Sequence, residues 1–281
     1  MLMKLLAILS MLLVLWLIMA QSCMTFRVSD AEARASFAKK GVTLAAHTIT
    51  VNNFPLHYVQ SGNDSFPTLV FVHGTPGSWN AFQDYLSDSA LLKHFRMISI
   101  DRPGFGYSNF GKALHLRQQS ELIRPLFTLL DNHHPVWLVG HSLGGPMILQ
   151  LAADNPGICK GLVIISGSND PYAEKAEKWR PYLFKTPLNY FIPGAFRPSN
   201  EELWYLKNDL LDLKSDLRKV TCPVYFIHGR KDTWVPPENV DYTKKMLTGT
   251  SVTHELWFPD GNHFIPWTKF NQIRDLLLQL N

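Results

Sequence analysis

Residues 136–145 read Val136-Trp137-Leu138-Val139-Gly140-His141-Ser142-Leu143-Gly144-Gly145, an apolar run that ends in Gly-x-Ser-x-Gly. A helix-compatible apolar segment, residues 147–153, follows directly. Strand, sharp turn and helix in this order lift a serine clear of a sheet on a strained backbone. Gly140 and Gly144 lie two residues either side of Ser142, where a side chain would collide with neighbouring chain. The pattern predicts that Ser142 is a nucleophile beside the positive end of a helix.

Segments of strand length alternate with segments that suit helices along much of the chain. Residues 68–72 are an unbroken apolar run, as expected of a strand buried on both faces. The predicted strands span residues 48–51, 56–60, 68–72, 96–100, 136–139, 161–166, 224–228 and 253–258, and the predicted helices span 79–86, 114–130, 147–153, 238–247 and 267–280. Such alternation predicts an α/β fold, with a mostly parallel twisted sheet of about eight strands flanked by helices.

The alternation stops over residues 167–219, a segment rich in aromatic residues. It is too long for a plain loop in a compact domain. We expect a small helical lid inserted over the C-terminal edge of the sheet, within a domain that spans residues 41–281. Most of the lid aromatics should pack the lid onto the body, and some could line an apolar pocket.

The N-terminus has the pattern of a targeting segment. Lys4 is followed by an almost unbroken apolar run from Leu5 to Ala20, and then by small residues before Cys23. A positive start, a short apolar run and small residues are typical of a secretory signal. The run is short for a bilayer span, which needs about 20 residues, although Trp16, Met24 and Phe26 could extend it into the interface.

Three fates are therefore open for residues 1–23: a cleaved signal peptide, a retained membrane anchor, or a lipid anchor at Cys23. The sequence before Cys23 resembles the lipid-attachment box of bacterial lipoproteins, although Ala20 stands where that box usually has Leu. Residues 24–40 should form a tether with a short helix, since Ser29 and Glu32 match a capping box. We expect an exported, membrane-tethered protein of the bacterial periplasm or cell envelope.

The remaining cysteines, Cys159 and Cys222, each precede a predicted strand. If those strands are neighbours, the two residues lie at one edge of the sheet. A disulfide is plausible in an exported protein, and two buried thiols are the alternative.

A serine hydroxyl needs a general base in contact with it, usually His, and that base needs a carboxylate to orient it. Reacting groups gather at the carboxyl ends of parallel strands. Asp232 follows one such end, and His263 follows another in a Gly-rich turn. The order Ser142, Asp232, His263 is the order expected for this arrangement.

Together these motifs resemble the capped branch of the α/β-hydrolases, which includes esterases, C–C bond hydrolases, epoxide hydrolases, haloalkane dehalogenases and prolyl aminopeptidases. The matching pieces run in the order of the family and are His73-Gly74-Thr75-Pro76-Gly77, Asp101-Arg102-Pro103-Gly104-Phe105-Gly106-Tyr107-Ser108, Gly140-His141-Ser142-Leu143-Gly144-Gly145, Gly229-Arg230-Lys231-Asp232 and Gly261-Asn262-His263-Phe264. The resemblance implies that Ser142 is the nucleophile, His263 the base and Asp232 its orienter. It also implies an oxyanion hole formed by the backbone N–H groups of Leu143 and Thr75.

The resemblance narrows the chemistry further. Epoxide hydrolases and dehalogenases of this branch use Asp as the nucleophile, so Ser142 favours acyl transfer through a serine ester. We expect a serine hydrolase that cleaves an ester or related acyl bond of a small apolar substrate. The alternatives are an acyltransferase, a prolyl-type aminopeptidase whose substrate amine binds a lid carboxylate (Glu174, Glu177, Glu201 or Glu202), and, least favoured, a non-catalytic ligand-binding relative.

Several other polar residues lie near the predicted site residues in the sequence or follow a predicted strand. Asp170, which follows the strand 161–166, is the alternative orienting acid. We expect His73 to shape the oxyanion loop, His141 to point away from the serine, and His133 and His134 to lie in a surface loop.

Composition limits the partners. The 281 residues are 46% hydrophobic and 18% charged, which is ordinary for a globular protein, and the net charge of +4 comes with no basic arm for nucleic acid. No cysteine and histidine spacing resembles a metal site. We expect a small-molecule substrate, membrane contact through the N-terminal segment, no nucleic acid, and no cofactor or metal.

Overall fold

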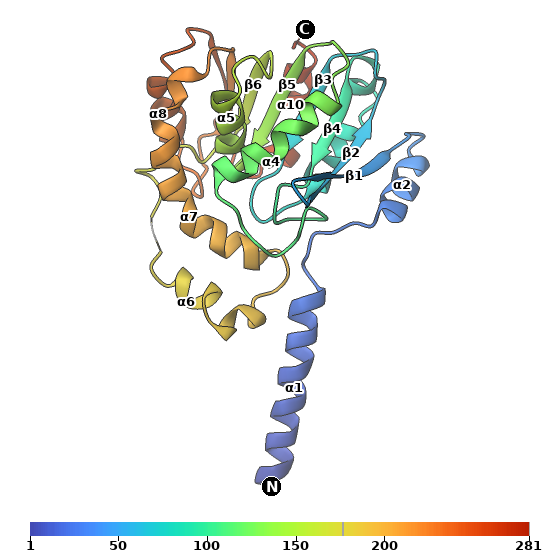
Figure 1. Cartoon of the computed structure of the whole chain (residues 1–281), viewed down its shortest axis with the longest axis vertical. Helices are drawn as coiled ribbons and strands as arrows, with labels where there is room; N and C mark the ends of the chain where they lie inside the picture. The colour runs from blue at the N-terminus through green and yellow to red at the C-terminus, as the bar shows by residue number, and fades with distance from the viewer. Residues whose placement is uncertain (176, 281) are drawn as a thin grey trace.

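The computed structural model describes residues 1–175 and 177–280. Its centre is an eight-stranded sheet in the order β1-β2-β4-β3-β5-β6-β7-β8 (Figure 1). The strands are β1 (Ala45–Val51), β2 (Phe54–Ser61), β3 (Thr68–Val72), β4 (Arg96–Ile100), β5 (Val136–His141), β6 (Gly161–Ile165), β7 (Val224–Gly229) and β8 (Thr253–Phe258). The strands pair in parallel except that β2 runs antiparallel to both of its neighbours. The predicted fold class is therefore confirmed.

The sheet register brings the carboxyl ends of the central strands level. Val72 pairs with both Ile100 and Gly140, and Ile165 pairs with both His141 and Ile227. Loops that leave β3, β4, β5, β6 and β7 therefore start along one edge of the sheet, where the predicted site residues lie.

Apolar side chains alternate between the two faces of the sheet, and each face has its own core. In β3, Val70 and Val72 join one core, whereas Leu69 and Phe71 join the other. Helices α4 (Leu116–Leu129), α5 (Gly144–Asp154) and α8 (Glu238–Met246) cover the first face. The short helices η1 (Trp79–Phe82), α3 (Gln83–Leu86), η2 (Leu91–Lys93) and α9 (Ile265–Thr268), with α10 (Phe270–Leu277), cover the second.

Local sequence explains the element ends. Asn52 and Asn53 both have positive φ, 50° and 62°, as a tight hairpin turn requires between β1 and β2. The predicted terminal helix over 267–280 is divided, because the helical conformation breaks at Lys269 between α9 and α10. Helix α2 (Asp30–Lys39) begins at the predicted capping box of Ser29 and Glu32.

The described residues between β6 and β7 form four helices, namely α6 (Arg180–Phe184), η3 (Pro187–Phe191), α7 (Phe196–Lys214) and η4 (Leu217–Lys219). We refer to residues 167–219 as the lid. Figure 1 shows α6 and the start of α7 at the end of the domain from which α1 projects.

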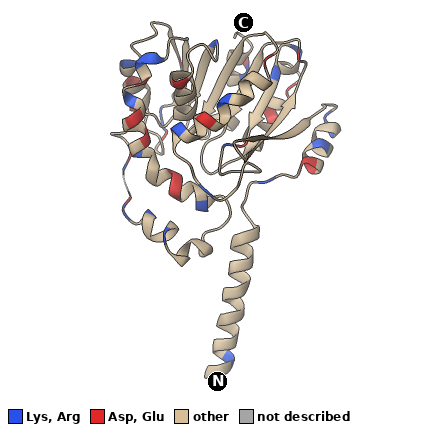
Figure 2. Ribbon diagram, viewed as in Figure 1, with Lys and Arg blue, Asp and Glu red and all other residues tan. Residues whose placement is uncertain are grey.

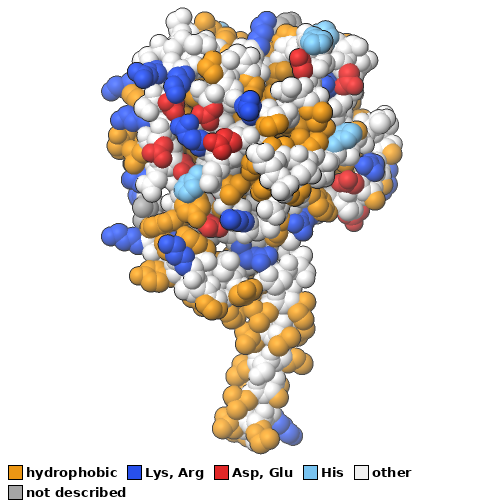
Figure 3. Space-filling view, viewed as in Figure 1, with side chains coloured by type: hydrophobic (Ala, Val, Ile, Leu, Met, Phe, Trp, Pro, Cys, Tyr) orange, Lys and Arg blue, Asp and Glu red, His pale blue; other side chains and the backbone are white. Residues whose placement is uncertain are grey.

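Helix α1 (Leu2–Ser22) extends away from the domain. It is long and apolar enough to cross a membrane, and Lys4 is its one charged residue (Figure 2). Hydrophobic side chains cover its exposed length, and Ala20 is its one buried residue (Figure 3). Because the apolar surface has no protein partner over most of this length, water is a poor solvent for the helix.

Candidate active site

Ser142 lies at the turn between β5 and α5 with a φ of 54°, in the left-handed region that side chains rarely adopt. Flanking glycines allow this turn. A Cβ on Gly140 would lie 2.3 Å from the carbonyl oxygen of Gly144, and a Cβ on Gly144 would lie 2.1 Å from that of Val72. The close approach expected from the sequence is therefore present, and Ser142 stands at the N-terminal end of α5.

Hydrogen bonds to neighbouring chain hold the serine turn in place. The Ser142 N–H donates to Ile165 O at 3.0 Å, and the Ser142 carbonyl accepts from Gly145 N at 2.9 Å and from Ser168 N at 3.2 Å. These bonds satisfy the buried backbone groups that the strained turn would otherwise leave unpaired.

His263 and Asp232 meet beside this turn. The Nδ1 atom of His263 lies 2.8 Å from Asp232 Oδ2, while Asp232 Oδ1 accepts from Trp234 N at 3.0 Å and Val235 N at 2.8 Å. Burial opposes the charge on Asp232, but its bonds to His263 and Val235 outweigh burial and lower its pKa. The carboxylate can therefore fix the ring with Nε2 free to accept a proton.

Ser142 and His263 line two adjoining cavities, each of about 430 Å³. The first extends under the lid, with walls from Trp179, Leu183, Ile192, Phe196 and Leu203. The second extends the other way, toward Phe26, Phe264 and Trp267. No hydrogen bond joins Ser142 Oγ to His263 among the described residues, so the predicted contact between nucleophile and base would require one of these side chains to move.

Sequence comparison identifies the family. A family model for the alpha/beta hydrolase fold matches residues 67–219. The chain belongs to the α/β-hydrolase fold family. The hydrolase is 32% identical over 208 residues to 2-succinyl-6-hydroxy-2,4-cyclohexadiene-1-carboxylate synthase of an Enterobacter species, covering 62% of this chain and 79% of the relative. It is 25% identical over 249 residues to pimeloyl-[acyl-carrier protein] methyl ester esterase of Nitrosomonas europaea, covering 74% of this chain and 92% of the relative.

Among solved structures, the hydrolase is similar to one described as a membrane phospholipase A, a novel bacterial virulence factor. The TM-score is 0.60 at 16% identity, and the match covers all of both chains. At this identity the likeness shows a shared fold.

Two buried histidines support the site, and the sequence analysis assigned neither of them this role. His141 Nε2 lies 3.0 Å from the carbonyl oxygen of His263, and burial together with the nearby His263 lowers the pKa of His141 to about 3. His228 Nε2 lies 3.0 Å from Val235 O, and burial lowers its pKa as well. Each neutral ring therefore donates to a loop that carries a site residue. The sequence feature that could have identified both histidines is their position, because each is a polar residue near the end of an apolar, buried strand.

The loop after β3, which is the predicted oxyanion loop, is held by Arg102, whose side chain is fully buried. The Arg102 guanidinium donates to the carbonyls of His73 at 2.8 Å and Gly74 at 3.1 Å. His73 is buried and lies within the loop, with Nδ1 2.7 Å from Gly74 O and Nε2 accepting from Arg102 N at 3.0 Å. Burial and the nearby Arg102 lower the pKa of His73, so the ring is neutral.

A lid carboxylate completes this arrangement. Glu202 of α7 accepts from Arg102 at 2.5 and 2.9 Å and from Gln119 Nε2 at 2.9 Å. Its side chain is buried, so the lid helix is joined through Arg102 to the loop after β3. Residues 102 and 202 are a hundred positions apart, and the sequence alone gave no sign of this pairing.

The other candidates lie elsewhere. Asp170 accepts from the N–H of Tyr172 and makes no recorded contact with His263 within the described part of the chain. Of the four lid glutamates, Glu174 lines the first cavity, Glu177 pairs with Arg180, and Glu201 accepts from Tyr205. His133 is exposed in the loop before β5, beside Asp131.

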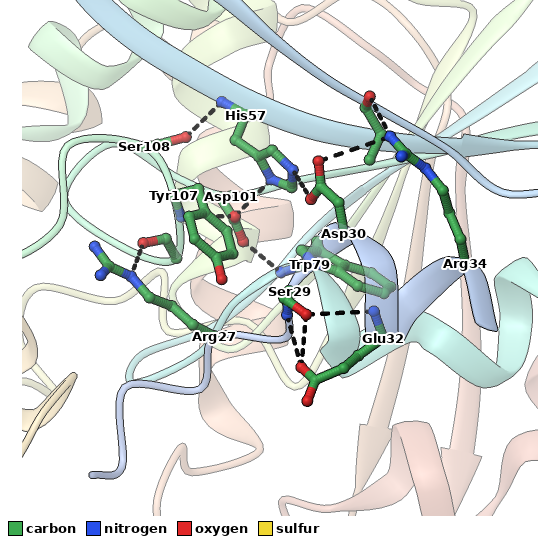
Figure 4. Close-up of polar contacts among 12 residues, drawn as sticks. Arg27, Ser29, Asp30, Glu32, Arg34, His57, Trp79, Asp101, Tyr107 and Ser108 are labelled. Carbon is green, nitrogen blue, oxygen red and sulfur yellow. Dashed lines mark hydrogen bonds and ion pairs between the residues drawn. The ribbon is translucent and has the colours of Figure 1, made fainter. Parts of the chain in front are cut away.

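A second network fixes the loop after β4, and Figure 4 shows it. Asp101 accepts from Trp79 N at 2.8 Å and Tyr107 N at 2.9 Å, and its Oδ2 lies 2.8 Å from His57 Nδ1. Asp30 of α2 lies 3.3 Å from the other ring nitrogen. Burial opposes the charge on His57, but the two carboxylates outweigh it and raise its pKa. Helix α2 is thereby attached to the core of the domain.

The cysteine pair is also placed. Cys159 and Cys222 are free thiols whose sulfur atoms are 3.9 Å apart, and they lie just before the neighbouring strands β6 and β7. The juxtaposition matches the expectation from sequence, and the structure contains the thiols rather than the disulfide.

Proposed function

We propose that this hydrolase cleaves an ester or related acyl bond through a serine ester intermediate. Ser142 Oγ would attack the acyl carbon while His263 Nε2 takes its proton, and the same proton would pass to the departing alcohol. Water, deprotonated by His263, would then release the acid and regenerate Ser142. The observation that carries the proposal is the strained serine turn facing the cavity into which the His263–Asp232 pair also opens.

The oxyanion hole of this proposal is formed by the N–H groups of Leu143 and Thr75. Leu143 begins the helix turn after the nucleophile, and both residues line the first cavity. Arg102 supports the Thr75 donor, because it binds the two preceding carbonyls and so fixes the loop. A preorganised donor of this kind is worth about 100- to 1,000-fold in rate.

Cavity chemistry favours an apolar acyl substrate. Aromatic and aliphatic side chains form most of the lid wall of the first cavity, and one of the relatives is named as a methyl ester esterase. Glu174 is the observation in favour of the aminopeptidase alternative, since its carboxyl group lies in that cavity. Burial raises the pKa of Glu174, however, which disfavours the charged carboxylate that a substrate amine would need, and Ser168 already donates to one of its two oxygens.

We further propose that α1 is retained as a membrane anchor. Trp16 Nε1 donates to Phe191 O at 3.1 Å, and Gln21 Nε2 donates to Tyr190 O at 2.7 Å. Gly194 N donates to Ala20 O at 2.9 Å. A signal peptide destined for cleavage would gain nothing from such contacts with the lid. Mass spectrometry of the membrane fraction tests this, because a mature chain that begins at a lipidated Cys23 would exclude retention.

The hydrolase proposal is tested with a fluorophosphonate probe, which reacts with activated serines. Labelling should fall to background in Ser142→Ala and persist in Ser87→Ala, a control serine that lines neither cavity. Labelling that persists in Ser142→Ala would place the nucleophile elsewhere. Parallel assays on nitrophenyl butyrate and a proline arylamide then separate esterase from aminopeptidase activity.

A further inference from the structure

Two short lid helices, α6 and η3, carry large exposed hydrophobic side chains, and η3 contacts α1. Tyr182 is 71% exposed, Tyr190 is 64% exposed and Leu188 is 49% exposed, all within α6 and η3. Figure 3 shows hydrophobic side chains on this part of the lid beside the apolar surface of α1. Large hydrophobic groups without a protein partner mark a contact surface, and here the surface is continuous with a helix that suits a bilayer.

Contacts between α1 and the lid determine how deep this surface would lie in a bilayer that α1 crosses. The 21 residues of α1 span about 31 Å at 1.5 Å per residue, which matches the hydrocarbon thickness of a bilayer. Trp16, which bonds to Phe191 O, lies six residues before Ser22, or about 9 Å along the helix. If α1 crosses the bilayer, η3 lies at the level of about the last 9 Å of the helix, which is the outer part of the hydrocarbon layer next to the headgroups. Tyr and Trp are enriched at that level because they combine an apolar body with a polar tip.

Charge at this level suits lipid headgroups as well. Arg27 follows α1 and Arg197 starts α7, and Arg197 also donates to Gln21 of α1 at 2.5 Å. Lys185 lies between α6 and η3 and is exposed. Cations in this position attract the phosphate groups of anionic lipids.

Only one layer of side chains separates this surface from the first cavity. Leu183 lines the cavity, while its neighbour Tyr182 on the same short helix is exposed. Trp179 both lines the cavity and is 49% exposed, so this one side chain belongs to the cavity wall and to the outer surface. The second cavity is walled by Phe26, four residues after the end of α1, and Phe196 borders both cavities. Two apolar spaces therefore meet at Ser142, one walled by the lid and the other by the segment that follows α1.

We propose that residues 179–191 lie in the bilayer interface and that substrate reaches Ser142 from the membrane, so that the substrate is an acyl lipid held in the bilayer rather than a dissolved ester. This inference rests on the proposed hydrolase activity. One cavity would take the acyl chain and the other the alcohol portion of the lipid, with the ester bond at Ser142 between them.

The surface is tested first without any catalysis. The full-length chain, with its three cysteines replaced by serine, receives an environment-sensitive fluorophore at Tyr190→Cys or, as control, at Leu129→Cys on α4, which is 59% exposed. In vesicles of phosphatidylcholine and phosphatidylglycerol that contain spin-labelled lipid, the Tyr190 probe should be quenched at least fivefold more than the Leu129 probe. Equal quenching at the two positions would overturn the interfacial placement.

The route is then tested with two substrates. Leu188→Glu/Tyr190→Glu should lower hydrolysis of a fluorogenic acyl phospholipid in the same vesicles at least tenfold and leave nitrophenyl butyrate hydrolysis within twofold of wild type. Leu129→Glu should change neither rate. Equal losses on both substrates, or no loss on either, would overturn entry from the membrane. If the wild-type chain cleaves neither substrate, the hydrolase proposal itself fails, and the quenching result still decides the placement of the lid.

Discussion

Replacing Glu202 should cost both stability and turnover, because this lid carboxylate neutralises a guanidinium that water does not reach. Glu202→Ala removes three hydrogen bonds, two from Arg102 and one from Gln119, and leaves the Arg102 charge buried without its counter-ion. Breaking a buried pair by removing one partner costs about 3–5 kcal/mol. At about 2–4 °C per kcal/mol for a domain of this size, the melting temperature should fall by about 6–20 °C.

Turnover should fall for a separate reason. Arg102 also holds the carbonyls of His73 and Gly74, so a displaced guanidinium frees the loop that carries the Thr75 donor. A misplacement of about 1 Å can cost about 100-fold in rate, and we expect a 10- to 100-fold loss of kcat on nitrophenyl butyrate.

Matched variants separate the two effects. Glu202→Gln keeps the shape and part of the bonding, so its losses should be smaller. The double variant Arg102→Met/Glu202→Leu removes both charges and should regain most of the stability but not the turnover. Asp212→Ala, an exposed acid on the same helix, serves as the control. Thermal melts by circular dichroism and initial rates measure both quantities. If Glu202→Ala melts within 1 °C of wild type and keeps its kcat, the coupling of lid to oxyanion loop is wrong.

Three further outcomes are expected. Asp232→Asn should lower kcat by about 10,000-fold because the ring of the base loses its tautomer, whereas Asp170→Asn should keep at least a third of the wild-type rate; the reverse ranking in an esterase assay would make Asp170 the orienting acid. Because the two adjacent carboxylates raise the pKa of His57, its contribution to stability is present below about pH 6.5 and is lost as pH rises through the folded-state pKa. The difference in unfolding free energy between wild type and His57→Gln should therefore shrink in that range, and a difference that grows with pH would contradict the assignment. Mild oxidation should join Cys159 to Cys222, which peptide mass spectrometry would detect; unmodified thiols after treatment of the folded protein would show that the strand ends cannot close the 3.9 Å gap.

Local sequence patterns were sufficient to predict the strands of the sheet and to choose the residues of the proposed triad. A buried strand such as β3 has an unbroken apolar sequence, and the turn at Ser142 has glycines where side chains would collide. Asp232 follows β7 and His263 follows β8. Because these two strands are parallel neighbours, both residues lie at the same edge of the sheet, independently of the sequence between the strands. These features depend on residues near one another in the chain, which is why they could be read from it.

Long-range contacts could not be predicted in the same way. The pairing of Arg102 with Glu202, and the wall that Phe26 supplies to the second cavity, depend on how the lid and the tether fold against the body. Neither of these two contacts is indicated by a residue spacing or a sequence motif. The terminal helix was misjudged for a local reason, since its apolar pattern continues across the break at Lys269.

The fastening of α1 to η3 has a practical consequence for enzymology. Preparing the catalytic domain as a shorter, water-soluble product without residues 1–22 would delete the partners of the Tyr190 and Phe191 carbonyls and strip one flank from the lid. Specificity profiles measured on such a truncated form would describe an enzyme with a looser cover than the one the full chain makes. Detergent-extracted, intact protein is therefore the proper reference for any substrate survey.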